Sequence, residues 1–130
     1  MPRRRFAVLL GLAAIVGALP AYAQEPQKYL IFFEEWSAQL DAAAQDVISQ
    51  AAGHARQNPT QMINVAGFAD TTGSKQANYY LSLLRAQVVS DKLVEKGVAS
   101  SRLQPVGEGS VNYVGSAQES RRVEIHIGTP

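Results

Sequence analysis

The sequence of 130 residues contains no cysteine and only two histidines. Without cysteine there are no disulfides, so the stability of the fold must come from the burial of apolar side chains. The two histidines, His54 and His126, stand apart from each other and from any recognisable Ser or Cys nucleophile motif. The sequence therefore predicts no metal site, no cofactor and no nucleophilic catalysis.

Apolar runs of membrane-spanning length are also missing. The longest run covers residues 6–19, follows arginines at positions 3–5 and precedes the small-x-small sequence Ala21-Tyr22-Ala23. It is shorter than the ~20 residues of a spanning helix, which argues against the alternative of a membrane anchor. The pattern predicts a signal peptide at residues 1–23, cleaved after Ala23, and a single mature domain at residues 24–130.

A strong excess of charge of either sign is missing too. Cleavage would leave nine basic and eleven acidic residues, a formal charge of −2. A mildly acidic chain has no electrostatic reason to bind nucleic acid or anionic lipid. Because no cysteine stands at the cleavage point, no site for bacterial lipid attachment exists there, and we expect a soluble exported product without membrane insertion.

The mature sequence alternates between strand-like and helix-like segments. Its periodicity predicts the order β-α-β-α-β-β, which is an α/β (α+β) fold with a mixed sheet and helices packed on one face. The predicted strands cover residues 28–33, 62–68, 102–109 and 121–128. The predicted helices run from about Leu40 to Asn58 and from Ser74 or Lys75 to Lys96, with Gly97 as the cap.

The residues of three predicted strands indicate their burial or their place in the sheet. Residues 28–33 form a continuous apolar run, which favours a strand buried on both faces. Pro105 makes a central position improbable for the third strand. Residues 121–128 alternate between apolar and polar side chains, which predicts one buried and one wet face.

The second predicted helix carries an unusual stripe of side chains. At 100° per residue, one narrow stripe contains Asn78, Ser82, Arg85, Val89 and Leu93. The C-terminal half of the stripe is apolar, whereas the N-terminal half carries an amide, a hydroxyl and a guanidinium. A guanidinium directed toward the interior needs a partner, because an unpaired buried charge costs several kcal/mol.

The loop before this helix places an acid at the same end of the molecule. Asp70 follows the second predicted strand, and Thr71, Thr72 and Gly73 favour a tight turn. Two interpretations remain open at this point: Asp70 caps the turn and pairs with Arg85, or the two charges hold a zwitterion. In the second, the carboxylate faces an ammonium and the guanidinium faces a carboxylate, as at the end of an amino acid.

Several motifs occur together in one order over residues 28–128. They are the Asp-x-x-Gly-Ser loop at 70–74, Asn78, Leu81-Ser82-x-x-Arg85-Ala86, Gly97-Val98, Arg102-Leu103, Gly107-x-Gly109 and Arg121-Arg122-Val123-Glu124-Ile125. In these motifs the chain resembles the OmpA-like peptidoglycan-binding domain, which is found in OmpA porins, peptidoglycan-associated lipoproteins and stator proteins of the MotB type.

The resemblance implies noncovalent binding of peptidoglycan through the diaminopimelate of its stem peptide, in the periplasm of a Gram-negative cell and in association with the outer membrane or cell wall. By motif position, Asp70 holds the ammonium and Arg85 the carboxylate of the ligand, with Asn78 in support. Thr72, Ser82 and Arg121 are further candidate supporting residues, and a structural salt bridge of Arg121 stays open. The family usually has His-Thr before the aspartate, where this chain has Phe68-Ala69.

Two other function classes make different demands on the residues. A wall hydrolase would need two acids flanking one bond, but Glu34 and Glu35 are adjacent and would face opposite sides of a strand. An envelope assembly module, with other envelope proteins as partners, would use the apolar residues off the main helix stripe, which are Leu83, Leu84, Val88 and Val94. Trp36 is expected at the edge of the core rather than as a pocket wall.

Overall fold

The computed structural model describes residues 27–111 and 116–128, so the predicted signal peptide at residues 1–23 lies outside the described residues. The elements are β1 (Gln27–Phe32), α1 (Ala42–Gln57), β2 (Ile63–Ala69), α2 (Lys75–Glu95), a 3-10 turn (Ser100–Arg102), β3 (Leu103–Ser110), α3 (Ala117–Ser120) and β4 (Arg122–Ile127). This confirms the predicted order of strands and long helices. The short helix α3 and the 3-10 turn were not predicted.

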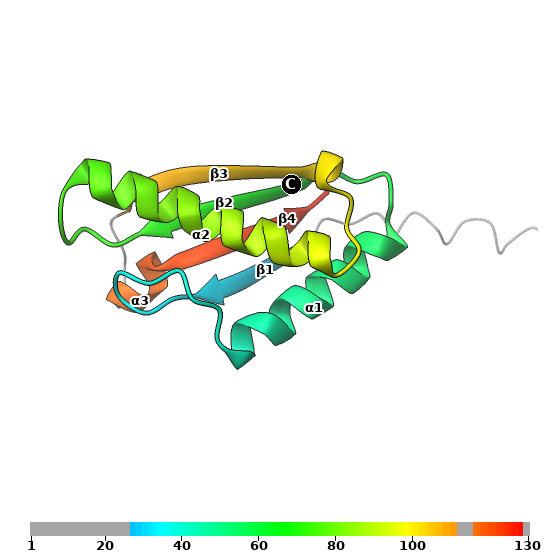
Figure 1. Ribbon diagram of the computed structural model, residues 1–130, viewed down its shortest axis with the longest axis horizontal. Helices are drawn as coiled ribbons and strands as arrows, with labels where there is room; N and C mark the ends of the chain where they lie inside the picture. Colours follow the sequence, from blue (N-terminus) through cyan, green and yellow to red (C-terminus); the bar gives the residue numbers. More distant parts are fainter. Residues whose placement is uncertain (1–26, 112–115, 129–130) are drawn as a thin grey trace, which may run out of the picture.

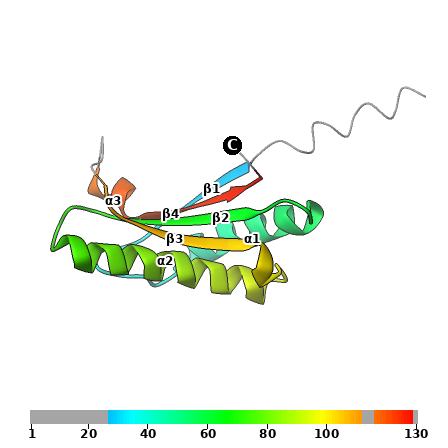
Figure 2. The same ribbon diagram turned by 90° about the horizontal axis from the view of Figure 1, so that it is seen from above.

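The strands form one mixed sheet in the order β1-β4-β2-β3. β2 and β3 are parallel, while β4 pairs antiparallel with both β1 and β2. α1 and α2 lie side by side on the same face of the sheet, as the two perpendicular views show (Figures 1 and 2). The predicted mixed sheet with helices on one face is therefore confirmed.

The prediction for β1 was wrong. β1 lies at the edge of the sheet, and only Ile31 among its residues is buried, whereas Leu30 is 39% and Phe32 38% exposed. Because side chains alternate along a strand, Leu30 and Phe32 lie on the opposite side of β1 from the buried Ile31. β3 occupies the other edge, as Pro105 predicted, because an edge strand tolerates the missing N–H.

Both long helices begin at side-chain caps. The carboxylate of Asp41 accepts a hydrogen bond from the amide of Ala44 at 2.8 Å, and the hydroxyl of Ser74 accepts one from Ala77 at 3.1 Å. α2 ends before Gly97, whose φ of 97° lies in the left-handed region that glycine favours. The predicted ends of α2 are thus correct to within one residue.

The core fills the space between the helices and the sheet. α2 packs directly on β2 at Gly67, where a Cβ atom would lie 1.9 Å from the carbonyl oxygen of Ser82. This close approach brings the polar half of the α2 stripe against the C-terminal end of β2. Within the described residues, no helix is long and apolar enough to span a membrane.

Candidate functional site

The predicted stripe on α2 is buried along its full length. Asn78 is 1% exposed, and Ser82 and Arg85 are 0% exposed, like the apolar Val89 and Leu93 further along the helix. The stripe prediction is confirmed. The stripe thus places three polar side chains close to the point where β2 ends and the loop of Asp70 begins.

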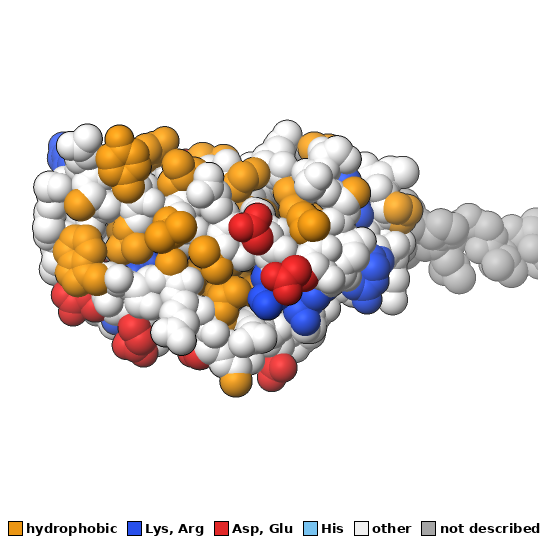
Figure 3. Space-filling view, viewed as in Figure 1, with side chains coloured by type: hydrophobic (Ala, Val, Ile, Leu, Met, Phe, Trp, Pro, Cys, Tyr) orange, Lys and Arg blue, Asp and Glu red, His pale blue; other side chains and the backbone are white. Residues whose placement is uncertain are grey.

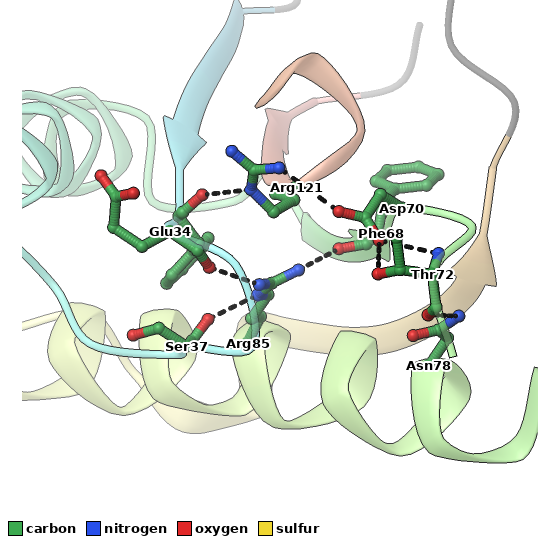
Figure 4. A network of polar contacts seen from close by, with 9 residues as sticks. Glu34, Ser37, Phe68, Asp70, Thr72, Asn78, Arg85 and Arg121 are labelled. Carbon is green, nitrogen blue, oxygen red and sulfur yellow. Dashed lines mark hydrogen bonds and ion pairs between the residues drawn. The ribbon is translucent and has the colours of Figure 1, made fainter. Parts of the chain in front are cut away.

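Arg85 is surrounded by backbone carbonyls. Its Nε donates to the oxygen of Ser37 at 2.7 Å, and its two terminal nitrogens donate to Phe68 and Glu34, each at 3.0 Å. Figure 4 shows the guanidinium between the segment of Glu34 and Ser37 and the end of β2. Three of its five N–H groups are thereby used, and its charge also lies 5.1 Å from the centre of the Phe33 ring.

The charge of Arg85 has no counter-charge in direct contact. Within residues 27–111 and 116–128, no carboxylate forms an ion pair with it. The pKa of Arg85 is lowered to about 10, mainly by burial and also by the positive charge of Arg121, while the negative charge of Asp70 partly offsets both effects. Arg85 is therefore a buried cation at neutral pH, and its hydrogen bonds run to neutral backbone carbonyls.

Asp70 pairs with Arg121 rather than with Arg85. Its Oδ1 accepts hydrogen bonds from the amide and the hydroxyl of Thr72, and its Oδ2 lies 3.3 Å from a terminal nitrogen of Arg121. Burial raises the pKa of Asp70, but the hydrogen bonds from Thr72 and the contact with Arg121 outweigh it, so the pKa lies below its ordinary value. Arg121 also donates to the Phe33 oxygen at 3.0 Å.

Asn78 and Ser82 support the loop and the end of β3. The Asn78 amide donates to the Thr72 oxygen and to the Ser110 hydroxyl, both at 2.8 Å. The Ser82 hydroxyl donates to the Tyr79 oxygen and accepts from the Gly109 amide, both at 2.8 Å. The structure thus brings all six sequence-predicted residues to one end of the sheet, with these two in contacts that hold the backbone.

A comparison with protein families shows the family to which the chain belongs. The model of the OmpA family matches residues 32–124, which is most of the chain. The chain belongs to the OmpA family.

The curated relatives include proteins named for peptidoglycan. The chain is 37% identical over 103 residues to the peptidoglycan-associated lipoprotein of Mesorhizobium japonicum, a match that covers 77% of this chain and 61% of that protein. It is 36% identical over 103 residues to the peptidoglycan-binding protein ArfA of Mycobacterium tuberculosis, with coverage of 75% and 32%. The chain therefore spans only about a third to three fifths of the length of these relatives.

Solved structures have the same fold. The C-terminal domain of Helicobacter pylori MotB superposes with a TM-score of 0.69 at 27% identity, covering 78% of this chain and 84% of that one. The peptidoglycan-associated lipoprotein of Burkholderia pseudomallei reaches 0.71 at 22% identity, covering 76% and 89%. The names of the two curated relatives refer to binding of peptidoglycan or association with it.

Phe68 contacts a cluster of charged side chains. The side chain of Phe68 lies under the guanidinium of Arg122, whose central carbon is 4.0 Å from the ring centre. Arg122 also bonds Glu124 at 2.6 Å, and His126 contacts the same carboxylate at 2.9 Å. Burial raises the pKa of Glu124, but these contacts outweigh it and lower the pKa overall. This charged cluster lies on the face of the sheet opposite α1 and α2, where Arg122 also donates to the Glu119 oxygen of α3 at 2.9 Å.

Sequence reasoning missed two features of the site. It could not name the carbonyls that hold Arg85, because every residue carries one. It also placed Trp36 at the edge of the core, whereas Trp36 is 50% exposed and lies outside the core cluster. In the part of the chain that the structure describes, no group of His, Asp or Glu side chains could hold a metal ion.

Proposed function

We propose that the chain binds peptidoglycan without catalysis, as a module of the cell envelope, and that it recognises the diaminopimelate of the stem peptide. The names of the relatives support the wall as the ligand. The observation that carries the choice of ligand group is the buried cation of Arg85, which forms no ion pair within the described residues.

The balance of charge at the site favours a ligand with a carboxylate. Arg85 and Arg121 bring two positive charges, while Asp70 brings one negative charge that is already in contact with Arg121. A carboxylate that approaches Arg85 would replace neutral dipoles by a full counter-charge, and hydrogen bonds between charged groups are about twice as strong as neutral ones.

Asp70 is the group that would hold an ammonium. A carboxylate offers about four acceptor positions, and Thr72 and Arg121 occupy three of them. Its lowered pKa keeps Asp70 ionised at every pH near neutrality. Asp70 and Arg85 together therefore match the two opposite charges that the free end of a diaminopimelate side chain presents.

Access to Arg85 requires a local movement. Its side chain is 0% exposed, and the carbonyls of Glu34 and Ser37 cover it from one side. The proposal therefore requires that the turn at residues 34–37 gives up a hydrogen bond to Arg85 when the ligand carboxylate enters. Since each of these bonds runs to a neutral acceptor, a charged oxygen would be the stronger partner.

The proposed location is the periplasm. The predicted signal peptide at residues 1–23 would export the domain, and the relatives include an outer membrane protein A and several lipoproteins. Other envelope proteins are the further partners we propose.

A second candidate function is assembly through the outer side of α2. Tyr80 is 59%, Leu84 48% and Val94 43% exposed, and hydrophobic side chains gather over the first half of α2 in the space-filling view (Figure 3). Sedimentation equilibrium of residues 24–130 tests this candidate. A monomer at all concentrations would argue against self-assembly through α2.

Cosedimentation with purified peptidoglycan sacculi tests wall binding. We expect residues 24–130 to sediment with sacculi, and Asp70→Asn to weaken the apparent affinity at least tenfold, or about 1.4 kcal/mol. Arg102→Lys is the matched control, because Arg102 also donates to backbone carbonyls but lies at the opposite end of β2.

Soluble ligands test the choice of stem peptide. Calorimetric titration with a diaminopimelate-containing tripeptide and with its lysine-containing counterpart should favour the first, because lysine lacks the second carboxylate. Equal affinities for the two tripeptides, or an Asp70→Asn variant that binds like the parent, would contradict the site assignment.

A further inference from the structure

Trp36 has a backbone conformation that a bulky side chain rarely adopts. Among the described residues it is the only non-glycine with a positive φ, 56°. It is the third residue of the turn that the Ser37 amide closes on the Glu34 oxygen at 3.1 Å. A positive φ at the third position is typical of a type II turn, where glycine or asparagine is the favoured residue. Tryptophan is therefore an unfavourable choice for this backbone.

The protein interior does not explain this choice. Trp36 is 50% exposed and makes no ring or cation-π contact with another residue of the described ranges. Its indole lies against Gly73, where a Cβ atom would come within 2.4 Å of the Trp36 Cη2 atom. The indole thus rests on the loop that begins with Asp70 and leaves its other side open to solvent.

The turn of Trp36 borders the candidate site through its backbone. The carbonyls of Glu34 and Ser37, which flank Trp36, both accept hydrogen bonds from Arg85. The hydrogen bonds of Arg85 thus hold the backbone on both sides of Trp36, while the indole lies against Gly73 in the loop that follows Asp70. A ligand held between Asp70 and Arg85 would extend past this aromatic face.

We infer that the exposed face of Trp36 stacks on an amino-sugar ring of the glycan strand that carries the stem peptide. The inference rests on the proposed function, since it takes peptidoglycan as the ligand. A sugar ring has a face of C–H groups that suits a flat indole, and the indole N–H remains available to a ring oxygen or hydroxyl.

The surroundings of the indole favour a sugar over a protein partner. Glu34 and Glu35 are exposed beside it, and residues 71–74 on its other side are exposed and polar. Carboxylates and hydroxyls match the hydroxyl and acetamido groups of amino sugars, whereas a protein interface would place apolar residues around an aromatic anchor.

Fluorescence tests the inference directly, because Trp36 is the only tryptophan in the chain. Residues 24–130 are titrated with three probes: the peptide-free disaccharide of N-acetylglucosamine and N-acetylmuramic acid, the diaminopimelate tripeptide, and the disaccharide joined to that peptide. We expect the disaccharide alone to change the Trp36 emission saturably. The joined ligand should bind about five- to tenfold more tightly than the tripeptide.

Substitutions separate the indole from the backbone. Trp36→Asn supplies a residue that the turn favours, so we expect an unchanged or higher Tm together with an unchanged tripeptide affinity. Calorimetry should show that the advantage of the joined ligand is lost. Trp36→Phe should retain part of it, and Tyr80→Ser, which removes another exposed ring from α2, should retain all of it.

The outcomes distinguish this inference from the proposed function. A disaccharide that leaves the emission unchanged, or a joined ligand that binds no better than the tripeptide, overturns the role of Trp36. Self-association that Trp36→Asn abolishes would overturn it in favour of a protein partner. An emission change with the disaccharide but no binding of the tripeptide would support the sugar site while refuting diaminopimelate recognition.

Discussion

Arg85 and Arg102 lie at opposite ends of β2, and both donate to backbone carbonyls. Arg102 reaches the oxygens of Ala55, Asn58 and Gln61 at distances of 2.8–3.1 Å, just where α1 ends and β2 is about to begin. Arg85 reaches three carbonyls at 2.7–3.0 Å near the other end of the same strand. The two side chains therefore make the same kind of contact in different surroundings.

The surroundings explain why a cation is stable at Arg102, but they do not explain the buried cation at Arg85. The C-terminal end of a helix presents free carbonyls and a partial negative charge, so a cation there is stabilising. Arg102 is only partly buried and keeps contact with water. The three carbonyls that Arg85 contacts lie outside the helices. Arg85 is completely buried and has a second cation, Arg121, near enough to lower its pKa. A cation in such a place is typical of a binding site.

The largest expected effect comes from removing each guanidinium. Arg85→Ala leaves three carbonyls and a cavity in the interior, so we expect the free energy of unfolding to fall by about 3–5 kcal/mol. Arg102→Ala exposes its carbonyls to water and should cost about 1–2 kcal/mol. Urea denaturation of both variants measures the difference. Equal losses of unfolding free energy in the two variants would contradict the difference between the two ends of β2.

A smaller effect is expected from Asp70→Asn. This substitution removes the charged acceptor of the hydrogen bonds from Thr72 and Arg121. It should lower the free energy of unfolding by about 1–3 kcal/mol at pH 7. The folded-state pKa of Asp70 is lowered, so the contribution of its charge is fully present above the unfolded pKa of ~3.9. It is lost as the pH falls through the folded pKa.

Urea denaturation between pH 2 and 7 measures this dependence. The stability difference between the parent and Asp70→Asn should be constant above about pH 5 and shrink at lower pH. Arg102→Lys serves as the control, since it leaves Asp70 in place. A difference between the parent and Asp70→Asn that grows as the pH falls would contradict the lowered pKa.

The smallest expected effect is a gain of stability from a substitution in α1, near the end of β2 where Arg102 lies. Gly53 lies inside α1, and a Cβ atom there would meet only the Arg56 side chain at 4.0 Å. Gly53→Ala should therefore raise the free energy of unfolding by about 0.5–1 kcal/mol, measured by urea denaturation. Binding to sacculi should not change. A loss of binding would show that the site depends on this distant end.

The sequence predicted the positions of Asp70, Asn78 and Arg85 better than it predicted their contacts. The sequence located Asp70, Asn78 and Arg85 because a strand end, a helix period and a cap are local patterns. It did not identify the ion pair between Asp70 and Arg121, which joins residues 51 positions apart. Such a pairing depends on how β4 lies beside β2, which no local pattern specifies.

By itself the sequence determined the order of the strands and long helices, the ends of α2 and the buried stripe on it, because periodicity and helix-end signals act over a few residues. Only the tertiary structure decided that β1 lies at an edge with Leu30 and Phe32 exposed, since an apolar run does not state which face receives a helix. The tertiary structure also decided which carbonyls surround Arg85. Carbonyls are chemically alike at every residue, so only the three-dimensional path of the chain selects among them.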